Sequence, residues 1–256
     1  MDTLLDLTGR TTLITGASSG LGRRFAKVMA ARGAKVALAA RRADRLESLA
    51  AEIAAAGGVA TAVTLDVTDE ASIIAGFDAA EASLGPIDTV IANAGMNHEG
   101  LAVEITAAAF DEVMAIYVRG VFLTARDGAR RMFAGGAKDS KRGRIVLISS
   151  IAGQQVQPAL TAYCASKAAV LMMGKSLARE WVNRGVNVNI VCPGYIETEL
   201  NDDWFASEGG KKHIAGFPRR RLMAEDGLDA MILYLSSDAA RAVTGSVFTL
   251  DDGQTL

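Results

Sequence analysis

Short apolar runs alternate with stretches of helical periodicity along the chain. Continuous, mostly apolar runs predict buried strands at residues 11–14, 35–39, 60–65, 88–92, 144–149, 186–191 and 246–250. Between them, apolar residues that share one helical face predict helices at residues 21–32, 43–56, from 68 onward, 106–134, 159–184 and 224–236. Strands that are apolar throughout and separated by helices are typical of a parallel sheet covered on both faces. The pattern therefore predicts an α/β, doubly wound, three-layer fold around a mainly parallel central sheet.

One segment departs from this alternation. Residues 195–223 are irregular and combine charged and polar residues with Trp204, Phe205 and Phe217. A long insertion that follows a strand and carries aromatic residues favours a substrate lid, and a plain surface loop is the alternative. No linker or low-complexity tract divides the chain, so residues 1–256 are expected to form a single domain.

Composition narrows the classes of function. The chain has 27 Lys and Arg against 29 Asp and Glu, a net charge of −2, which argues against binding to nucleic acids or anionic membranes. The two cysteines, Cys164 and Cys192, form no disulfide framework, and no cluster of metal ligands is visible, so no metal is expected. The N-terminus does not read as a signal peptide, and no run is apolar enough to span a membrane. We expect a globular cytoplasmic protein.

A glycine-rich turn, TGASSGLG at residues 15–22, joins the first predicted strand to the first predicted helix. Gly16 permits a tight turn, while Gly20 and Gly22 permit close approach of a pyrophosphate and close packing of the helix on the strand. Free N–H groups at a helix N-terminus attract anions. The turn therefore predicts a dinucleotide site. Its spacing is G-x-x-x-G-x-G rather than G-x-G-x-x-G, and an ordinary strand–helix turn is the alternative.

The end of the second predicted strand bears on the choice of dinucleotide. NAD-binding domains usually carry an acidic residue there, which holds the ribose 2′-hydroxyl. Here the strand ends in Ala40, followed by Arg41 and Arg42. No carboxylate repels a 2′-phosphate, and two guanidinium groups could bind one. NADP(H) is therefore the predicted cofactor, and the alternative is that both arginines are solvated charges.

A tyrosine and a lysine, Tyr163 and Lys167, lie four residues apart in a predicted helix and so share one face. A phenol has an ordinary pKa of about 10, and a nearby ammonium group lowers that pKa. The pair could then transfer a proton near neutral pH. A surface helix pair is the alternative, but the preceding strand ends in Ser149 and Ser150, which favours a catalytic site.

Together these features resemble the short-chain dehydrogenase/reductase family, and the resemblance extends from Thr11 to Gly253. Ser150 precedes Tyr163 by 13 residues, as the serine of that family does. The matching motifs are TGASSGLG at 15–22, Asp66-Val67, Asn93-Ala94-Gly95, Ser150, Tyr163 with Lys167, and Pro193-Gly194 with Ile196 and Thr198. Arg41 stands where NADP-preferring members carry a basic residue.

The resemblance implies a Rossmann-like fold and a role for each matching residue. Ser150 would hydrogen-bond the substrate oxygen, Tyr163 would transfer the proton, and Lys167 would hold the nicotinamide ribose and lower the pKa of Tyr163. Cofactor contacts are expected from Gly16, Ser18, Ser19, Gly20, Leu21, Gly22, Arg41, Arg42, Asp66, Val67, Asn93, Ala94, Gly95, Tyr163, Lys167, Pro193, Gly194, Ile196 and Thr198. The family also suggests a homotetramer, or a homodimer.

Two positions depart from the family pattern. Tyr117 stands where the family usually has an asparagine that keeps a water in the proton relay to the lysine. Its hydroxyl could substitute for the amide, its ring could block the water, or it could be a packing residue. Near the C-terminus, Asp251-Asp252-Gly253 replaces the usual Asp-Gly-Gly, which puts no catalytic residue in doubt.

The predicted function is reduction of a ketone, or oxidation of a secondary alcohol, with NADP(H). The alternatives are an NAD-dependent alcohol dehydrogenase of the same fold and a non-catalytic dinucleotide-binding protein. The small-molecule substrate is expected to lie among residues after Gly95, residues 151–157 and the lid at 195–222. There Gln154, Gln155, Trp204 and Phe205 suggest mixed polarity with apolar room, compatible with a cyclic, aryl or steroid-like ketone. Residues 219–221, three arginines, could instead bind an anionic group, although solvation or a subunit contact is the default.

Overall fold

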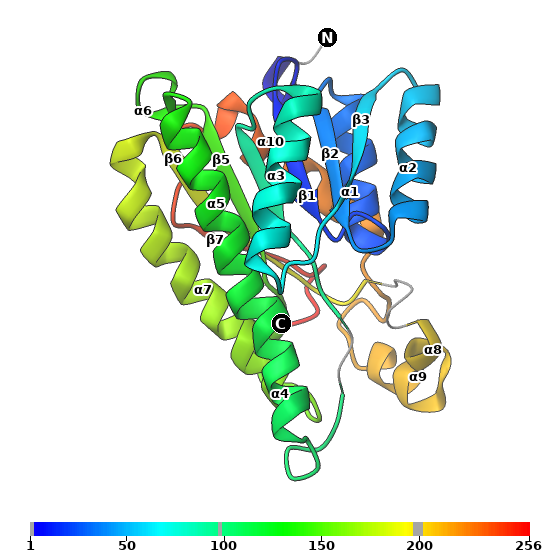
Figure 1. Cartoon of the computed structure of the whole chain (residues 1–256). Coiled ribbons are helices and arrows are strands. Elements are labelled where there is room, and N and C mark those ends of the chain that lie inside the picture. Colours follow the sequence, from blue (N-terminus) through cyan, green and yellow to red (C-terminus); the bar gives the residue numbers. More distant parts are fainter. Residues whose placement is uncertain (1–2, 97–98, 197–201) are drawn as a thin grey trace.

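The computed structural model describes residues 3–96, 99–196 and 202–256. Its strands form one sheet in the order β3-β2-β1-β4-β5-β6-β7, and every neighbouring pair is parallel (Figure 1). The strands are β1 (Thr11–Thr15), β2 (Lys35–Ala40), β3 (Val59–Thr64), β4 (Thr89–Ala92), β5 (Gly143–Ile148), β6 (Val186–Pro193) and β7 (Val247–Leu250). The predicted α/β, doubly wound, Rossmann-like fold is confirmed.

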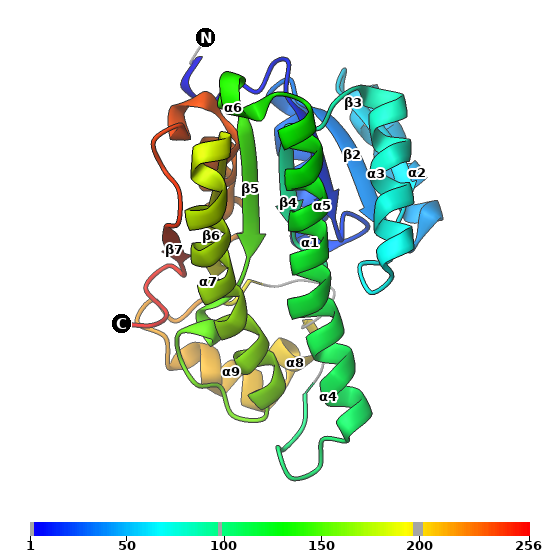
Figure 2. The same ribbon diagram turned by 60° about the vertical axis from the view of Figure 1, so that its left-hand side comes forward.

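Helices cover both faces of the sheet. On one face lie α1 (Gly20–Ala31), α2 (Ala43–Ala55) and α10 (Asp229–Ser236), and on the other lie α3 (Glu70–Leu84), α5 (Val121–Ala134) and α7 (Thr161–Trp181) (Figures 1 and 2). The remaining α-helices are α4 (Ala107–Met114), α6 (Ala137–Ser140), α8 (Asp202–Ala206) and α9 (Glu208–Ala215). Short 3-10 turns occupy Thr3–Leu5, Ile151–Gly153, Val182–Arg184, Glu225–Leu228 and Asp238–Ala240.

The continuous apolar strands are explained by burial on both sides. Leu13 and Val90 point into the layer beneath α3, α5 and α7, whereas their neighbours Ile14 and Ile91 point into the layer beneath α1, α2 and α10. Alternate residues of a strand face opposite sides, so a central strand of a doubly covered sheet needs apolar residues at every position.

Two predicted elements differ from the structure. The helix predicted over residues 106–134 is interrupted by a π-helical turn, Ala115–Gly120, between α4 and α5. Apolar periodicity does not reveal this turn, because one extra residue per turn leaves the neighbouring helical faces intact. The segment 195–223 was predicted to be irregular, yet it contains α8 and α9, which lie together beyond the carboxyl ends of the strands (Figure 1).

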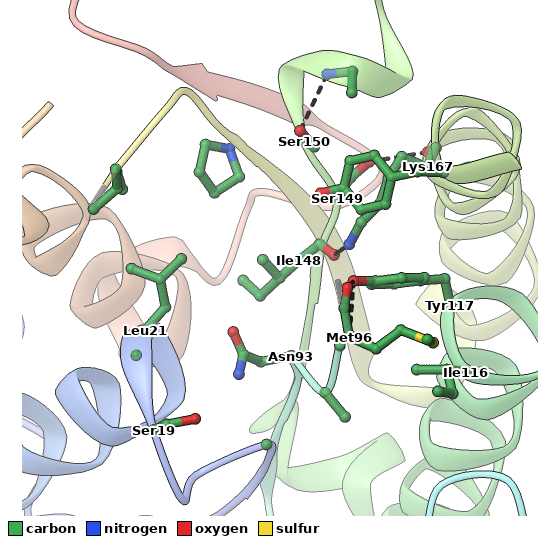
Figure 3. A pocket seen from close by; sticks show the side chains of 18 of the residues that line it. Ser19, Leu21, Asn93, Met96, Ile116, Tyr117, Ile148, Ser149, Ser150 and Lys167 are labelled. Atoms are coloured by element: carbon green, nitrogen blue, oxygen red, sulfur yellow. Dashed lines mark hydrogen bonds between the residues drawn. The ribbon is translucent and has the colours of Figure 1, made fainter. Parts of the chain in front are cut away.

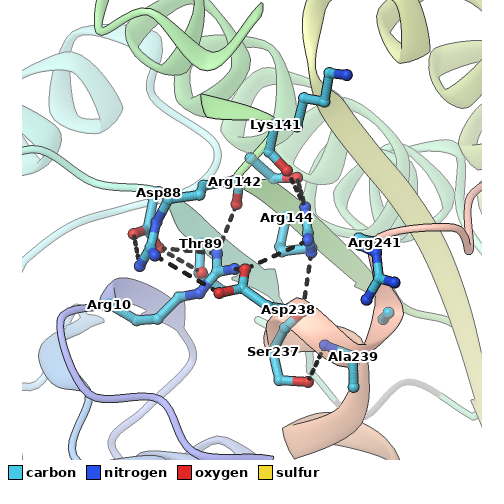
Figure 4. Close-up of polar contacts among 12 residues, drawn as sticks. Arg10, Asp88, Thr89, Lys141, Arg142, Arg144, Ser237, Asp238, Ala239 and Arg241 are labelled. Carbon is cyan, nitrogen blue, oxygen red and sulfur yellow. Dashed lines mark hydrogen bonds and ion pairs between the residues drawn. The ribbon is translucent and has the colours of Figure 1, made fainter. Parts of the chain in front are cut away.

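A buried ionic cluster lies at the amino ends of β1, β4 and β5 (Figure 4). Arg10 is 2% exposed and pairs with Asp238 and, at 3.5 Å between Nη1 and Oδ1, with Asp88. Arg144 is 1% exposed, and its Nε donates to the carbonyl of Ser237 at 3.2 Å. The cluster therefore ties the sheet to the 3-10 turn that follows α10.

The model also bears on membranes and metals. Among the described residues, no helix is both long and apolar enough to cross a bilayer. The same residues contain no group of three or more histidine, cysteine or acidic side chains arranged to hold a metal ion.

Candidate active site

A cavity of about 880 Å³ opens at the carboxyl ends of the strands. Ligands of open parallel sheets bind at this edge, where the chain crosses from one face to the other. The three predicted catalytic residues, Ser150, Tyr163 and Lys167, all line the cavity. Most predicted cofactor residues line it as well: Gly16, Ser18, Ser19, Gly20, Leu21, Arg41, Arg42, Asp66, Val67, Asn93, Ala94, Gly95, Pro193, Gly194 and Ile196.

Two predicted cofactor residues are not among the lining residues. A Cβ on Gly22 would lie 2.3 Å from the carbonyl oxygen of Gly16, so this glycine allows α1 to pack on the turn and does not itself line the cavity. Thr198 lies outside the described residues.

The glycine turn is held in shape from the end of β4. Gly16 and Gly20 have φ angles of +71° and +48°, which side chains rarely adopt. The Asn93 amide donates to the carbonyl of Thr15 at 3.1 Å, and the N–H of Asn93 donates to the Thr15 hydroxyl at 3.0 Å. A Cβ on Gly16 would lie 2.8 Å from Cα of Ala94. The Asn-Ala-Gly motif therefore supports the turn as well as lining the cavity.

The start of α1 is suited to an anion. Ser19 stands at the N-cap with extended backbone, and its side chain makes no capping hydrogen bond. The first-turn N–H groups are therefore not satisfied by that side chain, and with the helix dipole they favour a negatively charged group such as a pyrophosphate.

Both arginines after β2 lie at the same end of the cavity as the glycine turn. Nη2 of Arg42 donates to the hydroxyls of Ser18 and Ser19, at 2.9 Å in each case. Burial acts to raise the pKa of Asp66, but hydrogen bonds from Thr68 and the charge of Arg41 leave it below its ordinary value. Two guanidinium groups and two hydroxyls thus lie together beyond Ala40, at the glycine-turn end of the cavity.

The predicted catalytic residues come from two parts of the chain that meet at the cavity (Figure 3). Ser150 lies two residues after the end of β5, at the N-cap of the 3-10 turn Ile151–Gly153, and its hydroxyl accepts a hydrogen bond from the N–H of Ala152 at 3.1 Å. Tyr163 and Lys167 occupy successive turns of α7. Nζ of Lys167 donates to the carbonyl of Ile148 at 2.9 Å and lies 5.5 Å from the centroid of the Tyr163 ring.

Burial shifts the pKa values of this pair toward the uncharged forms. Burial raises the pKa of Tyr163 above its ordinary value, and a hydrogen bond with Ser150 opposes that shift. Burial also lowers the pKa of Lys167 to about 7. The sequence predicted a lowered pKa for Tyr163, whereas in the structure its pKa is raised and the phenol stays protonated. The reason is that desolvation of the phenolate outweighs any attraction to the lysine.

Tyr117 lies at the centre of the π-helical turn and enters the cavity beside Lys167 (Figure 3). Its hydroxyl donates to the carbonyl of Met96 and accepts from the N–H of Met96 at 2.8 Å. Its ring centroid lies 4.3 Å from Nζ of Lys167 and 5.2 Å from the ring centroid of Tyr163. The ring, and not the hydroxyl, therefore faces the lysine.

Sequence reasoning missed the residue that organises the other end of the cavity. Tyr195 contacts four aromatic rings, those of Trp204, Phe205, His213 and Phe217, with centroids 5.0 to 6.4 Å away. Its only signal in the sequence is its position directly after Pro193-Gly194.

The glutamines predicted to line the substrate pocket point elsewhere. Oε1 of Gln154 accepts from the hydroxyl of Thr249 at 3.0 Å, and Nε2 of Gln155 donates to the carbonyl of Thr255 at 3.2 Å. Both side chains are satisfied by the C-terminal segment, so this prediction is wrong. Gln157 lines the cavity instead, and its Oε1 accepts from the hydroxyl of Tyr195 at 2.8 Å.

The residues present fit a dinucleotide. A glycine turn with two positive φ angles, a helix start without a side-chain cap and a basic pair follow one another along one side of the cavity. The serine, tyrosine and lysine lie on the other side. This arrangement combines a place for pyrophosphate and ribose with an acid–base pair beside it.

Comparison with known proteins agrees with this geometry. The family model described as short chain dehydrogenase matches residues 10–209. Nodulation protein G of Rhizobium sp. (strain N33) is 35% identical over 251 residues, which cover 98% of each chain. Gluconate 5-dehydrogenase of Gluconobacter oxydans (strain 621H) is 34% identical over 254 residues, which cover 99% of this chain and 97% of that one.

Solved structures resemble the fold over nearly its full length. A short-chain type dehydrogenase/reductase from Mycobacterium marinum has a TM-score of 0.92 and 36% identity, covering 99% of this chain and 98% of that one. A gluconate 5-dehydrogenase from Burkholderia cenocepacia J2315, in complex with NADP and tartrate, has a TM-score of 0.92 and 30% identity, covering 98% and 97%.

Proposed function

The chain belongs to the short-chain dehydrogenase/reductase family, and we propose that it reduces a ketone to a secondary alcohol with NADP(H). Family membership makes it an NAD(P)-dependent oxidoreductase of alcohol and ketone groups. The observation that carries the proposal is the placement of Ser150, Tyr163 and Lys167 on one cavity with the glycine turn.

Each catalytic side chain has a task that its position supports. When bound, the nicotinamide ring supplies the hydride for reduction and accepts it for oxidation. Ser150 donates its hydroxyl proton in a hydrogen bond to the substrate oxygen, and Tyr163 transfers its phenolic proton to that oxygen. Lys167 holds the ribose hydroxyls and, when charged, stabilises the phenolate that remains on Tyr163.

The protonation state of Tyr163 favours the reductive direction. A general acid must carry its proton before the reaction begins. Burial raises the pKa of Tyr163 and so keeps the phenol protonated at neutral pH. A ketone that enters the cavity therefore meets a proton donor, whereas an alcohol would first need that proton removed.

The basic pair after β2 supports NADP(H) over NAD(H). Ala40 leaves the strand end without a carboxylate, and Arg42 is held by the hydroxyls of Ser18 and Ser19. A 2′-phosphate at this place would accept hydrogen bonds from both guanidinium groups. An NAD-dependent alcohol dehydrogenase is the second candidate, because the relatives include enzymes named for the oxidation of polyhydroxy substrates. We also propose that the protein assembles as a homotetramer or homodimer, as the family suggests.

Turnover with a panel of ketones tests the reaction. NADPH oxidation by the wild type is compared with that by Tyr163→Phe, which keeps the ring and removes only the hydroxyl. We expect the substitution to lower kcat by roughly 10³-fold, within the range for loss of a general acid. Turnover that Tyr163→Phe leaves unchanged, or none with any ketone, would refute the mechanism and leave a non-catalytic dinucleotide-binding protein as the better explanation.

Titration of NADPH against NADH tests the cofactor. Replacing Arg41 or Arg42 with alanine is expected to raise the KM for NADPH roughly 10-fold, since each charge-assisted hydrogen bond to a phosphate contributes about 1.5–3 kcal/mol before solvent screening reduces it. The KM for NADH is the internal control and is expected to stay within twofold. Equal effects on both cofactors would contradict a 2′-phosphate site.

A further inference from the structure

The part of the cavity beyond Ser150 and Tyr163 is mostly apolar. Met96, Leu160, Tyr195, Trp204 and Phe205 line it, and the three aromatic residues among them form one packed cluster. The centroid of the Tyr195 ring lies 6.4 Å from that of Trp204 and 5.7 Å from that of Phe205. Flat aromatic walls favour a substrate with a ring and offer few hydrogen bonds to a chain of hydroxyl groups.

Two polar side chains in this region, Tyr195 and His213, are uncharged, and of the two only Tyr195 has a side-chain hydrogen bond, since Nε2 of His213 is buried without a partner among the described residues. The hydroxyl of Tyr195 donates to Oε1 of Gln157, and burial, with neighbouring groups that include Glu99, raises the pKa of Tyr195 to about 12. Tyr195 is therefore a neutral partner of Gln157 at physiological pH. Burial likewise lowers the pKa of His213, which keeps that imidazole uncharged at neutral pH.

The positive charges of the cavity lie at its other end. Among the described residues that line it, Arg41 and Arg42 follow β2 beside the glycine turn, and Lys167 is bonded to the carbonyl of Ile148. Beyond Tyr163, the charged lining residue is Glu99. An anionic substrate would therefore meet a carboxylate in place of a counter-charge.

Two of the three arginines at residues 219–221 form ion pairs outside the cavity. Nη1 of Arg219 lies 3.1 Å from Oδ1 of Asp252, and Nε of Arg221 donates to Oδ2 of Asp252 at 2.9 Å. Neither lines the cavity. Arg219 and Arg221 therefore hold the C-terminal turn, and Arg220 does not line the cavity either, which removes the evident candidates for binding an anionic substrate group.

The backbone beside Glu99 is joined to the loop before α7. The N–H of Gly100 donates to the carbonyl of Ala159 at 2.9 Å, which joins the loop after β4 to the loop before α7. Ala159 has a φ of +62°, a left-handed conformation that side chains seldom adopt. This cross-loop bond ties the backbone next to Glu99 to the loop before α7, and Glu99 lines the cavity there with its charge acting on Tyr195.

We propose that the substrate is a ring-bearing ketone or secondary alcohol without negative charge, and that Glu99 rejects carboxylates and favours an ammonium substituent. The inference rests on the proposed reductase function and adds the class of substrate to it. It sets this chain apart from relatives named for gluconate, whose substrate is an acid.

Three acetophenones that differ only at the para position test the proposal: methyl, carboxylate and aminomethyl. We expect kcat/KM at low salt to be highest for the aminomethyl compound and lowest for the carboxylate. The attraction or repulsion between one unit charge and an exposed carboxylate corresponds to roughly 5-fold in kcat/KM for each sign. Glu99→Gln is expected to reduce the ratio of kcat/KM for the aminomethyl compound to kcat/KM for the carboxylate roughly 10-fold. Added salt is expected to reduce the same ratio in the wild type, but by less.

Glu104→Gln is the matched control, because Glu104 is exposed in the same loop and does not line the cavity. Equal effects of the two substitutions, or a wild type that prefers the carboxylate or gluconate, would overturn the proposal while leaving the reductase function intact. The Kd values of the three compounds for Tyr163→Phe with NADPH, followed by tryptophan fluorescence, test the same order without turnover. If no ketone were turned over but the Kd values followed the expected order, the proposed function would be refuted and the charge selection by Glu99 would stand.

Discussion

Positively charged side chains are buried at both ends of the strands, but their partners differ. At the amino edge, Arg10 is 2% exposed and paired with Asp88 and Asp238 (Figure 4). At the carboxyl edge, Lys167 is 4% exposed, and among the described residues its neighbours are a carbonyl and two aromatic rings rather than a carboxylate (Figure 3).

The difference separates a structural charge from a chemical one. A buried cation with ionic partners keeps its charge, and removing it leaves its partners unpaired. A buried cation without them loses its proton more easily, which is why the pKa of Lys167 falls to about 7. Residues whose pKa is shifted by desolvation within a cleft are candidates for function, and Lys167 meets that description.

The largest expected effect comes from removing the lysine charge. Lys167→Met is expected to lower kcat/KM for ketone reduction by roughly 10³-fold, because the phenolate of Tyr163 loses its stabilising charge. The free energy of unfolding is expected to stay the same or rise, since an unpaired buried cation costs stability. NADPH oxidation and urea unfolding measure the two quantities. A variant that stays within 10-fold of wild-type activity would contradict the functional role.

Replacing the buried arginine at the amino ends of the strands with methionine should have the opposite outcome, a loss of stability without a loss of activity. Arg10→Met is expected to lower the free energy of unfolding by about 1–3 kcal/mol, because Asp88 and the carbonyl of Arg142 lose a buried donor. The loss is limited because Arg142 and Arg144 still pair with the carboxylates. Activity of the folded protein should remain within twofold. Arg241→Met is the control, because Arg241 is exposed near the same cluster, and its effect should be below about 0.5 kcal/mol. A loss of activity in Arg10→Met without loss of stability would break the comparison.

The pH dependence sharpens the comparison further. Ketone reduction is expected to decline above pH 7, approaching 10-fold per pH unit, as Lys167 loses its proton with a pKa of about 7. In the unfolded chain a lysine has a pKa of about 10.4 and binds more protons than the folded one between these values, so its contribution to stability rises with pH across that window.

Lys167→Met serves as the control for both measurements. Urea unfolding at pH 7 and pH 9.5 should show the wild type gaining stability relative to Lys167→Met as the pH rises. The residual activity of the variant should lose the decline near pH 7. A stability difference that shrinks with rising pH would mean that the lysine keeps its charge in the folded protein.

The sequence predicted what depends on local pattern and chemically distinctive residues. Continuous apolar strands, the glycine turn and the spacing of Tyr163 and Lys167 each have a local physical cause, and the structure has them at the expected places. Tyr195 and Glu99 could not be predicted in the same way, because their importance arises from segments that meet only after folding. The outward direction of Gln154 follows from a partner, Thr249, that is distant in the sequence.

The smallest expected effect concerns Tyr117, whose role the sequence left open. Tyr117→Phe keeps the ring against Lys167 and removes only the hydrogen bonds with the backbone of Met96. We expect a decrease in kcat/KM of about threefold and a loss of about 1–3 kcal/mol in stability, the cost of unsatisfied backbone groups.

Tyr117→Asn removes the ring as well and opens space beside the ammonium group. Because water could then solvate Lys167, the pKa of that lysine should rise toward its ordinary value, and the decline in activity should move to higher pH. The pH profile of kcat for both variants separates the two contributions, since only the ring controls access of water to the lysine. If Tyr117→Asn left both the rate and the pH profile unchanged, Tyr117 would be a packing residue, and the isolation of Lys167 would have to come from Tyr163 and the carbonyl of Ile148.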